Sequence, residues 1–189
     1  MKSHLEVTSG HQTVLSDQHL AQPGQYLTFV LGGEAFALGI LNIKEIIDYG
    51  NVTEVPMMPE FIKGVINLRG RGVPVVDLAA RFGRGSTQIG KRTGIVIVET
   101  KSVSDDEDYE HQQDIGIIVD AVNEVVDIDR DDIEPAPTFG ARIRQDFISG
   151  MAKRNGRFII LLNVNRVLSI DEFAALKHVA AEGNLADSV

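Results

Sequence analysis

Residues 61–78 read FIKGVINLRGRGVPVVDL, and residues 147–164 repeat the same design as FISGMAKRNGRFIILLNV. Asn155-Gly156 in the second stretch is a residue pair preferred in type I′ turns, which indicates a β-hairpin. The first stretch aligns with the second without a gap and places its own turn at residues 67–70. We therefore predict that Arg69 lies at a hairpin turn, with its guanidinium outside the hydrophobic core.

The two hairpins belong to a longer internal repeat. Residues 36–48 align with residues 115–127 at one constant spacing, and the match resumes in the hairpins after a short insertion. Aligned glutamate, aspartate, proline and glycine positions support the repeat, because hydrophobic residues match easily by chance. Gly32-Gly33 separates two further β-rich runs and predicts another two-residue turn. We predict an all-β fold of two related units, each of about five strands, packed together around a groove.

The two copies differ at the hairpin turn. Glu45 of the first copy aligns with Glu124, whereas Arg69 aligns with Asn155. A Glu–Arg pair can therefore form in the first copy alone, and we interpret this asymmetry as an indication of function. Pro74 lies in the same hairpin. Because proline cannot donate to a strand ladder, we expect its strand at a sheet edge.

Three other segments depart from the strand pattern. Residues 1–24 are polar and end in Pro-Gly, which predicts a flexible tail. Residues 100–114 are polar and strongly acidic, so we predict a mobile surface loop, either solvated or a docking site for a basic partner. Residues 171–189 are predicted to form a C-terminal helix and a tail, with Ser169 as the helix cap.

The composition excludes several classes of function. The chain has 189 residues, a formal net charge of −9 and no cysteine. A negative field repels phosphate backbones, so we expect no nucleic-acid partner, and the lack of cysteine excludes disulfides and thiolate metal sites. The sequence has neither a hydrophobic run long enough to span a membrane nor a secretory signal, which predicts a cytoplasmic protein.

No motif predicts an active site, a metal centre or a cofactor. The sequence lacks a nucleophile elbow and a P-loop, and Gly70 and Gly72 lack the third glycine of a dinucleotide fingerprint. Its carboxylates cluster in segments such as residues 129–134, where solvated charge is expected. The histidines are scattered, which is typical of surface residues: His4, His11, His19, His111 and His178. We predict a non-enzymatic protein.

Residues 61–83, FIKGVINLRGRGVPVVDLAARFG, resemble the most recognisable stretch of the CheW family of chemotaxis adaptors. The resemblance continues in order through QYLTFVLGGEAFALGILNIKEI, DIGIIVDAVNEVVDI and ISGMAKRNGRFIILLNVNRVL, and covers roughly residues 25–170. It implies two SH3-like five-stranded β-barrels side by side, at about residues 25–90 and 91–168, and allows strands to be exchanged between them.

The resemblance also assigns roles to single residues. Arg69 and Glu45 match the family's functional pair for receptor binding, and Phe139 matches an aromatic residue at a kinase or ring contact. Four further residues match positions around the receptor-binding groove: Ile43, Lys63, Gly64 and Val75. Burial in a barrel core is an equally good reading of Ile43, Val75 and Phe139, and the exposure of each side chain decides between the two.

The function implied by the resemblance is a scaffold that couples methyl-accepting chemoreceptors to the histidine kinase CheA. Its partners would be the receptors' cytoplasmic tips and the regulatory domain of CheA, within arrays that reach the membrane through the receptors. Two features depart from the family pattern. Arg71-Gly72 replace a bulkier hydrophobic pair, and the acidic segment is longer than usual. The alternatives are an adaptor for a different chemosensory pathway, such as pilus motility or biofilm formation, and a small-molecule-binding β module.

Overall fold

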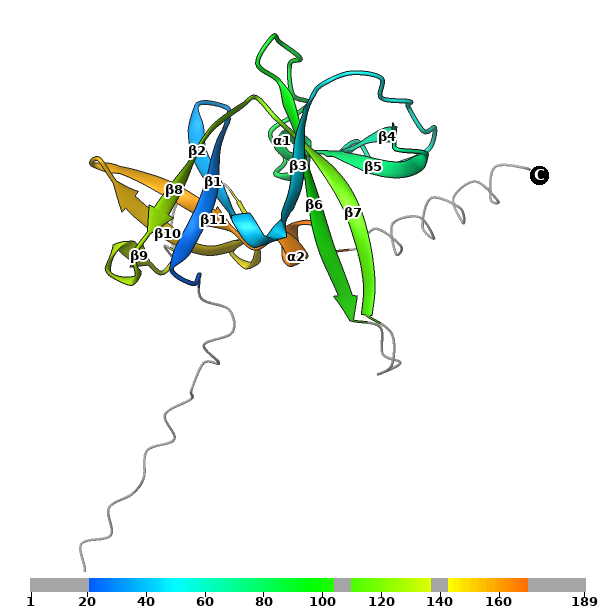
Figure 1. The fold of residues 1–189 in the computed structure, drawn as a ribbon. Helices are drawn as coiled ribbons and strands as arrows, with labels where there is room; N and C mark the ends of the chain where they lie inside the picture. Colours follow the sequence, from blue (N-terminus) through cyan, green and yellow to red (C-terminus); the bar gives the residue numbers. More distant parts are fainter. Residues whose placement is uncertain (1–20, 104–109, 137–142, 170–189) are drawn as a thin grey trace, which may run out of the picture.

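Two β-sheets stand side by side and make up most of the molecule (Figure 1). The structure is a computed structural model that describes residues 21–103, 110–136 and 143–169. The predicted all-β fold with two β units is confirmed. The N-terminal tail before Ala21, the C-terminal helix and Phe139 lie outside the described residues.

The first sheet has six strands in the order β8-β1-β2-β11-β10-β9. Their bounds are β1 Gly24–Leu31, β2 Glu34–Gly39, β8 Ala121–Ile128, β9 Ile133–Glu134, β10 Ile148–Arg154 and β11 Arg157–Leu162. The sheet encloses a small hydrophobic core of its own, which includes Tyr26, Val126 and Leu161. We call this unit the first barrel.

The second sheet has five strands in the order β3-β6-β7-β5-β4. Their bounds are β3 Ile43–Asp48, β4 Ile62–Leu68, β5 Arg71–Asp77, β6 Gly94–Val103 and β7 Glu110–Val119. This unit, the second barrel, surrounds a core that includes Ile66, Val75 and Ile97. A third and larger core lies between the two sheets, where the rings of Phe36 and Phe82 stack 5.7 Å apart.

Neither barrel is built from one copy of the repeat. β1 and β2 of the first copy pair with β8, β10 and β11 of the second, while β3, β4 and β5 of the first copy pair with β6 and β7 of the second. The parallel pairs at the junctions are equivalent, because Ala37 opposite Leu161 corresponds to Gly116 opposite Val75. The two copies therefore exchange strands in the same way, and each barrel contains both.

Short helices follow equivalent strands of the two sheets. α1 (Leu78–Arg81) follows β5 and α2 (Val164–Val167) follows β11. Each begins at a side chain that accepts a backbone N–H, Asp77 before α1 and Asn163 before α2, which satisfies a donor left open at the helix start. The remaining helical turns are 3-10 segments: η2 Ile40–Asn42, η3 Arg130–Asp132 and η4 Gln145–Phe147.

The predicted two-residue hairpin turns are confirmed. Arg69 and Gly70 have φ of 51° and 81°, Asn155 and Gly156 have 52° and 75°, and Gly32 and Gly33 have 57° and 80°. Positive φ at both central residues defines the type I′ turn, whose twist matches that of the strands. Asn67 supports the Arg69 turn, because its Oδ1 accepts the Gly70 N–H at 2.8 Å.

The expectation that Pro74 lies on an edge strand is wrong, because β5 runs between β7 and β4. Val65, opposite Pro74, exchanges both backbone hydrogen bonds with Thr53 and so turns its polar groups away from Pro74. The nitrogen of Pro74 therefore faces the β7 side, where pairing starts one residue later, at Val75. The proline avoids a lost hydrogen bond by its place in the ladder and not by an edge position.

The prediction of a loop at residues 100–114 is also wrong in part. β6 and β7 continue through both ends of this segment, with Thr100 opposite Gln113 and Val103 opposite Glu110. They form a two-stranded ribbon that projects from the body of the second barrel (Figure 1). Only residues 104–109 lie outside the described part of the segment. The hairpin ladder satisfies the backbone N–H and C=O groups of the two strands.

Candidate functional site

Arg69 stands at the tip of the β4–β5 hairpin and reaches Glu45 on β3. Its Nη2 donates a hydrogen bond to Glu45 Oε2 at 2.6 Å, and the two side chains are 77% and 23% exposed. The predicted pair is therefore formed, through one hydrogen bond and not the two of a fork-shaped pair. An exposed pair of this kind contributes about 0–1 kcal/mol to stability. Its main effect is to fix the direction in which the guanidinium points.

Gly64 is buried in β4 and determines how closely the preceding loop approaches the strand. A Cβ at this position would lie 2.1 Å from the carbonyl oxygen of Thr53, and the backbone φ is +155°. The same oxygen accepts the Val65 N–H at 2.8 Å, and the Thr53 N–H donates back to Val65 at 2.9 Å. Glycine allows this close approach because it has no side chain. Gly64 therefore allows the loop that carries Thr53 to pack directly on β4.

Exposure distinguishes the remaining groove candidates. Val75 is 0% exposed and packs in the core of the second barrel, so the reading of Val75 as a groove residue is replaced by the core reading. Ile43 is half-buried against the core between the sheets and keeps part of its surface accessible. Lys63 is also partly exposed. Ile43 and Lys63 can therefore contribute atoms to a binding surface, whereas Val75 cannot.

A second set of charges lies beside the Arg69–Glu45 pair, at one end of the second barrel. Glu99 lies on the face of β6 that also carries Ile97, a residue of the second core. Asp114 lies on the face of β7 that also carries Ile118, another residue of the second core. The two carboxylates are directly opposite each other in the β6–β7 ladder. Like charges in this position repel, so the pair needs cations.

Lys44 and Arg71 supply these cations. Lys44 Nζ lies 2.8 Å from Asp114 Oδ1 and 3.4 Å from Glu99 Oε2, and Arg71 Nη1 lies 3.7 Å from Asp114 Oδ2. The hydrogen bond with the Asp114 carboxylate, more than the charge of Glu99, raises the pKa of Lys44 above its ordinary value of 10.5. Together with the first pair these residues form the charged rim: Lys44, Glu45, Arg69, Arg71, Glu99 and Asp114.

Sequence reasoning did not find the charged rim as a unit. Glu99 precedes the acidic segment and Asp114 is its last residue. Without the strand register, these two carboxylates could not be distinguished from the solvated charges between them. Arg71 was noted only as a departure from the family pattern.

The first barrel provides an internal comparison for the charged rim. The pair equivalent to Glu99 and Asp114 is Val30 opposite Ala35 in the β1–β2 hairpin. Asn123 stands in place of Lys44, and among the described residues no ion pair forms between the first barrel's equivalents of the rim. The fold is therefore compatible with uncharged residues at the positions of Lys44, Glu99 and Asp114, so this cluster is not a requirement of the architecture.

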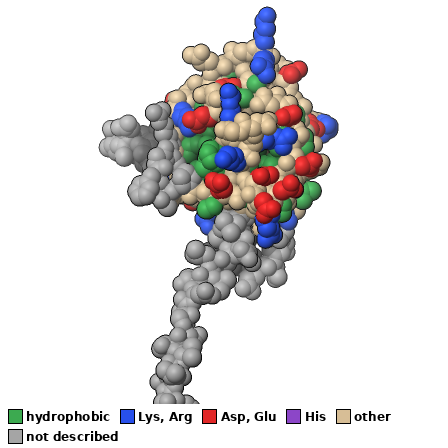
Figure 2. Space-filling view, turned by 90° about the vertical axis from the view of Figure 1, so that its left-hand side faces the viewer, with side chains coloured by type: hydrophobic (Ala, Val, Ile, Leu, Met, Phe, Trp, Pro, Cys, Tyr) green, Lys and Arg blue, Asp and Glu red, His purple; other side chains and the backbone are tan. Residues whose placement is uncertain are grey.

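The first barrel also exposes hydrophobic side chains. Val125 on β8 is 48% exposed and Phe158 on β11 is 47% exposed. The view from the side of the first barrel shows acidic and basic side chains interspersed over that face, with hydrophobic ones exposed between them (Figure 2). The second barrel also exposes a hydrophobic side chain, Ile46 on β3, at 46%.

A family model described as the CheW-like domain matches residues 25–172, which is most of the chain. The chain belongs to the CheW-like family. The matched range contains the internal repeat, the Arg69 turn and, apart from Gly24, both barrels. It also contains every residue to which the resemblance assigned a role.

Similar proteins include the chemotaxis protein CheW of Klebsiella aerogenes, which is 32% identical over 156 residues, or 82% of this chain and 88% of the relative. Protein FrzA of Myxococcus xanthus is 29% identical over 150 residues, or 78% of this chain and 88% of the relative. The crystal structure of the scaffolding protein TtCheW from Thermoanaerobacter tengcongensis matches with a TM-score of 0.67 and 35% identity, and covers 82% of this chain and 94% of that one.

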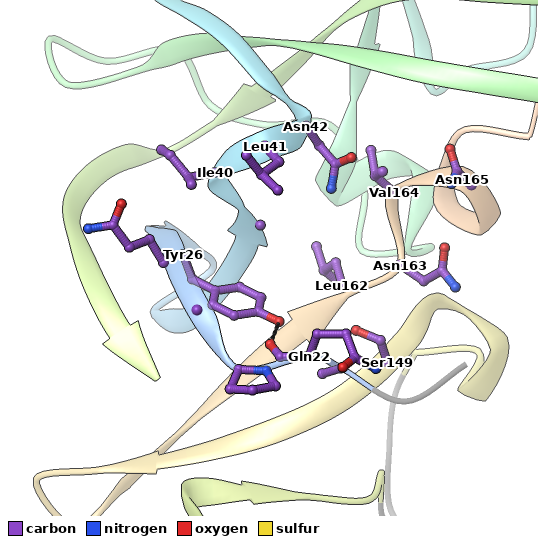
Figure 3. Close-up of a pocket in the computed structure, with 15 residues that line it drawn as sticks. Gln22, Tyr26, Ile40, Leu41, Asn42, Ser149, Leu162, Asn163, Val164 and Asn165 are labelled. Atoms are coloured by element: carbon purple, nitrogen blue, oxygen red, sulfur yellow. Dashed lines mark hydrogen bonds between the residues drawn. The ribbon is translucent and has the colours of Figure 1, made fainter. Parts of the chain in front are cut away.

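A pocket of about 400 Å³ lies between the start of β1, η2 and α2 of the CheW-like domain (Figure 3). Leu162 and Val164 give it hydrophobic surface, while Asn42, Asn163 and Asn165 supply uncharged amides. The pocket is open to solvent, and no charged side chain is among its lining residues. An open pocket without converging charges counts against the alternative of a small-molecule module.

The described residues bring together no group of three or more metal-binding side chains. No helix in the described part of the chain is long and hydrophobic enough to cross a membrane. Phe139, the predicted kinase or ring contact, is not among the residues that the structure describes.

Proposed function

We propose that the chain is a non-enzymatic adaptor that couples chemoreceptors to the histidine kinase CheA. It binds the cytoplasmic tips of methyl-accepting chemoreceptors and the regulatory domain of CheA, and it reaches the membrane only through the receptors. The observation that carries the proposal is the presentation of Arg69. A type I′ turn projects this arginine from the second barrel, and Glu45 holds its guanidinium at 2.6 Å. Membership of the CheW-like family and the similarity to chemotaxis proteins support a role in chemotaxis signalling.

The receptor surface consists of the Arg69–Glu45 pair with Ile43, Lys63 and the loop that Gly64 positions. A charged pair beside half-buried hydrophobic atoms suits a helix that lays one face on the protein. The guanidinium can donate to the helix through hydrogen-bond positions that Glu45 leaves open. The exposed hydrophobic side chains Val125 and Phe158 make the first barrel a candidate surface for CheA.

An adaptor changes the output of the kinase only if it binds differently in the two signalling states of the receptor. In this mechanism no chemical step takes place on the chain itself. This mechanism needs close packing between the barrels, because a change in receptor binding at one barrel must alter kinase binding at the other. The stacked aromatic rings between the sheets provide such packing.

The test is the charge reversal Arg69→Glu. The variant should keep its fold, because the side chain is exposed and the pair contributes little to stability, but it should lose receptor-dependent activation of CheA. The measurement is kinase activity in reconstituted mixtures of receptor, adaptor and CheA, with circular dichroism as the control for folding. Normal activation by a folded Arg69→Glu variant would disprove the assignment.

A second candidate is an adaptor for another chemosensory pathway, such as pilus motility or biofilm formation. The observation in its favour is the similarity to protein FrzA, a relative whose name is not that of a chemotaxis CheW. Pull-down of the purified chain against the receptors and kinases encoded near it separates the two candidates by which kinase is retained.

A further inference from the structure

In the charged rim the acidic side chains are less exposed than the basic ones, which the net charge of the chain does not suggest. Its acidic members are the less exposed ones: the Asp114 side chain is 10% exposed and Glu99 28%, whereas Arg71 is 71% exposed. Lys44 and Arg69 also extend over their carboxylate partners. The most exposed members of the charged rim are therefore cations, on a chain whose formal net charge is −9.

Arg71 is the most available of these cations for a partner. Its guanidinium lies 3.7 Å from Asp114, a distance beyond hydrogen-bond range, and among the described residues it makes no hydrogen bond. A guanidinium has five N–H donors in a planar fork that matches a carboxylate. Asp114 orients Arg71 by charge while leaving those donors open to another acceptor.

The position of Arg71 ties it to the receptor surface. Arg69 and Arg71 flank Gly70 in one hairpin turn, so both guanidinium groups start from the same tip. Arg69 is already bonded to Glu45 at 2.6 Å, while Arg71 is held loosely. A helix that contacts Arg69 would bring its neighbouring side chains to Arg71.

We propose that Arg71, supported by the Asp114–Lys44–Glu99 cluster, takes a carboxylate from the helical partner and so selects receptors that carry an acidic residue at this contact. The inference rests on the proposed function, since it names the chemistry of the same partner. Charge complementarity is its basis: an acidic helix side chain meets an exposed guanidinium whose own carboxylate partner is largely buried. The uncharged equivalents on the first barrel, Val30 and Ala35, indicate that the cluster serves binding and not folding.

The experiment measures binding of purified full-length variants to a receptor signalling fragment at low and at moderate salt. Arg71→Glu should weaken binding by about tenfold or more, because a charge-assisted hydrogen bond is replaced by repulsion. Arg71→Ala removes the charge without placing a third carboxylate near Glu99, and it should weaken binding less while reducing the salt dependence. Binding to the CheA regulatory domain should be unchanged in both.

Arg157→Glu is the matched control. Arg157 is the equivalent of Arg71 at the exposed turn of the first barrel, so its reversal changes the net charge by the same amount at a site without the cluster. Receptor binding should be unaffected by this variant. A receptor fragment in which one acidic side chain of the tip is changed to lysine should restore binding to Arg71→Glu and weaken binding to the native chain.

The outcomes separate this inference from the function on which it rests. If Arg71→Glu and Arg71→Ala bind the receptor fragment like the native chain while Arg69→Glu does not, the role of Arg71 is disproved and the proposed function stands. Loss of CheA binding, and not of receptor binding, in the Arg71 variants would also overturn the inference. If the native chain binds no receptor fragment at all, both proposals fail.

Discussion

A single methyl group at Gly64 tests whether the close contact between β4 and the loop before it holds the receptor surface in place. In Gly64→Ala the new Cβ would lie 2.1 Å from the carbonyl oxygen of Thr53 and 2.8 Å from its carbonyl carbon. Both atoms are backbone, so neither can rotate away. The loop must move, and the two hydrogen bonds between Thr53 and Val65 must stretch or break.

The magnitude follows from these contacts. A side chain held at positive φ costs about 1–3 kcal/mol. Loss of the two bridge hydrogen bonds adds about 0.5–1.5 kcal/mol each. The free energy of unfolding should therefore fall by about 2–6 kcal/mol, and since 1 kcal/mol shifts the Tm of a domain of this size by about 2–4 °C, the Tm should fall by at least about 4 °C.

The assay is thermal and urea unfolding of Gly64→Ala against the native chain, followed by receptor binding and by proteolysis of residues 49–61. Gly156→Ala is the control: its φ is +75°, but no atom lies within 4 Å of the added Cβ, so it carries the backbone strain without the clash. Gly64→Ala should be the less stable variant and the one with a cleavable loop. Equal Tm values for the two variants would refute the argument that close approach is limiting.

Two further predictions concern single cations. Because the pKa of Lys44 is raised in the folded state, its contribution to stability is complete below the ordinary value of 10.5 and is lost as the pH rises through the higher folded value. The difference in unfolding free energy between the native chain and Lys44→Met should thus be constant from pH 7 to about pH 10 and shrink above it, and a difference that grows with pH would contradict this sign. Arg81 lies 4.9 Å from the ring centres of both Phe61 and Phe147 and donates from Nε to the Val167 carbonyl at 3.0 Å. Arg81→Met should therefore lower the unfolding free energy by about 1–3 kcal/mol in urea titrations, and a change below about 0.5 kcal/mol would exclude Arg81 as a link between the barrels.

The sequence was sufficient for the parts of the fold that depend on local signals. Asn155-Gly156 and Gly32-Gly33 predict their turns because type I′ geometry requires positive φ at both positions. The alignment of the repeat carried this information to Arg69, where an arginine alone would not indicate a turn. The Glu45–Arg69 pair was found for the same reason, since the repeat fixed both positions relative to the strands.

Features that depend on strand register could not be read in this way. Pro74 suggested an edge strand because proline cannot donate to a ladder. The ladder with β7 begins one residue later, at Val75, and only the observed strand pairing reveals this. The acidic segment looked like a loop because its charge density conceals the alternation of a hairpin. Val75 was assigned to the groove by resemblance, with burial in the core as the alternative, and the sequence alone does not show whether a hydrophobic residue of a strand is buried or exposed.

The exchange of strands has a consequence for the origin of the molecule. One copy of the repeat supplies two strands to one barrel and three to the other, so a lone copy could complete neither. Two separate copies would close both barrels as a symmetric homodimer, with the same surface presented twice. When the two copies are joined in one chain, the residues on one surface can change without any change in those on the other. Arg69 could then arise on one side while the opposite side kept Asn155, so the two barrels came to present different side chains at equivalent turns.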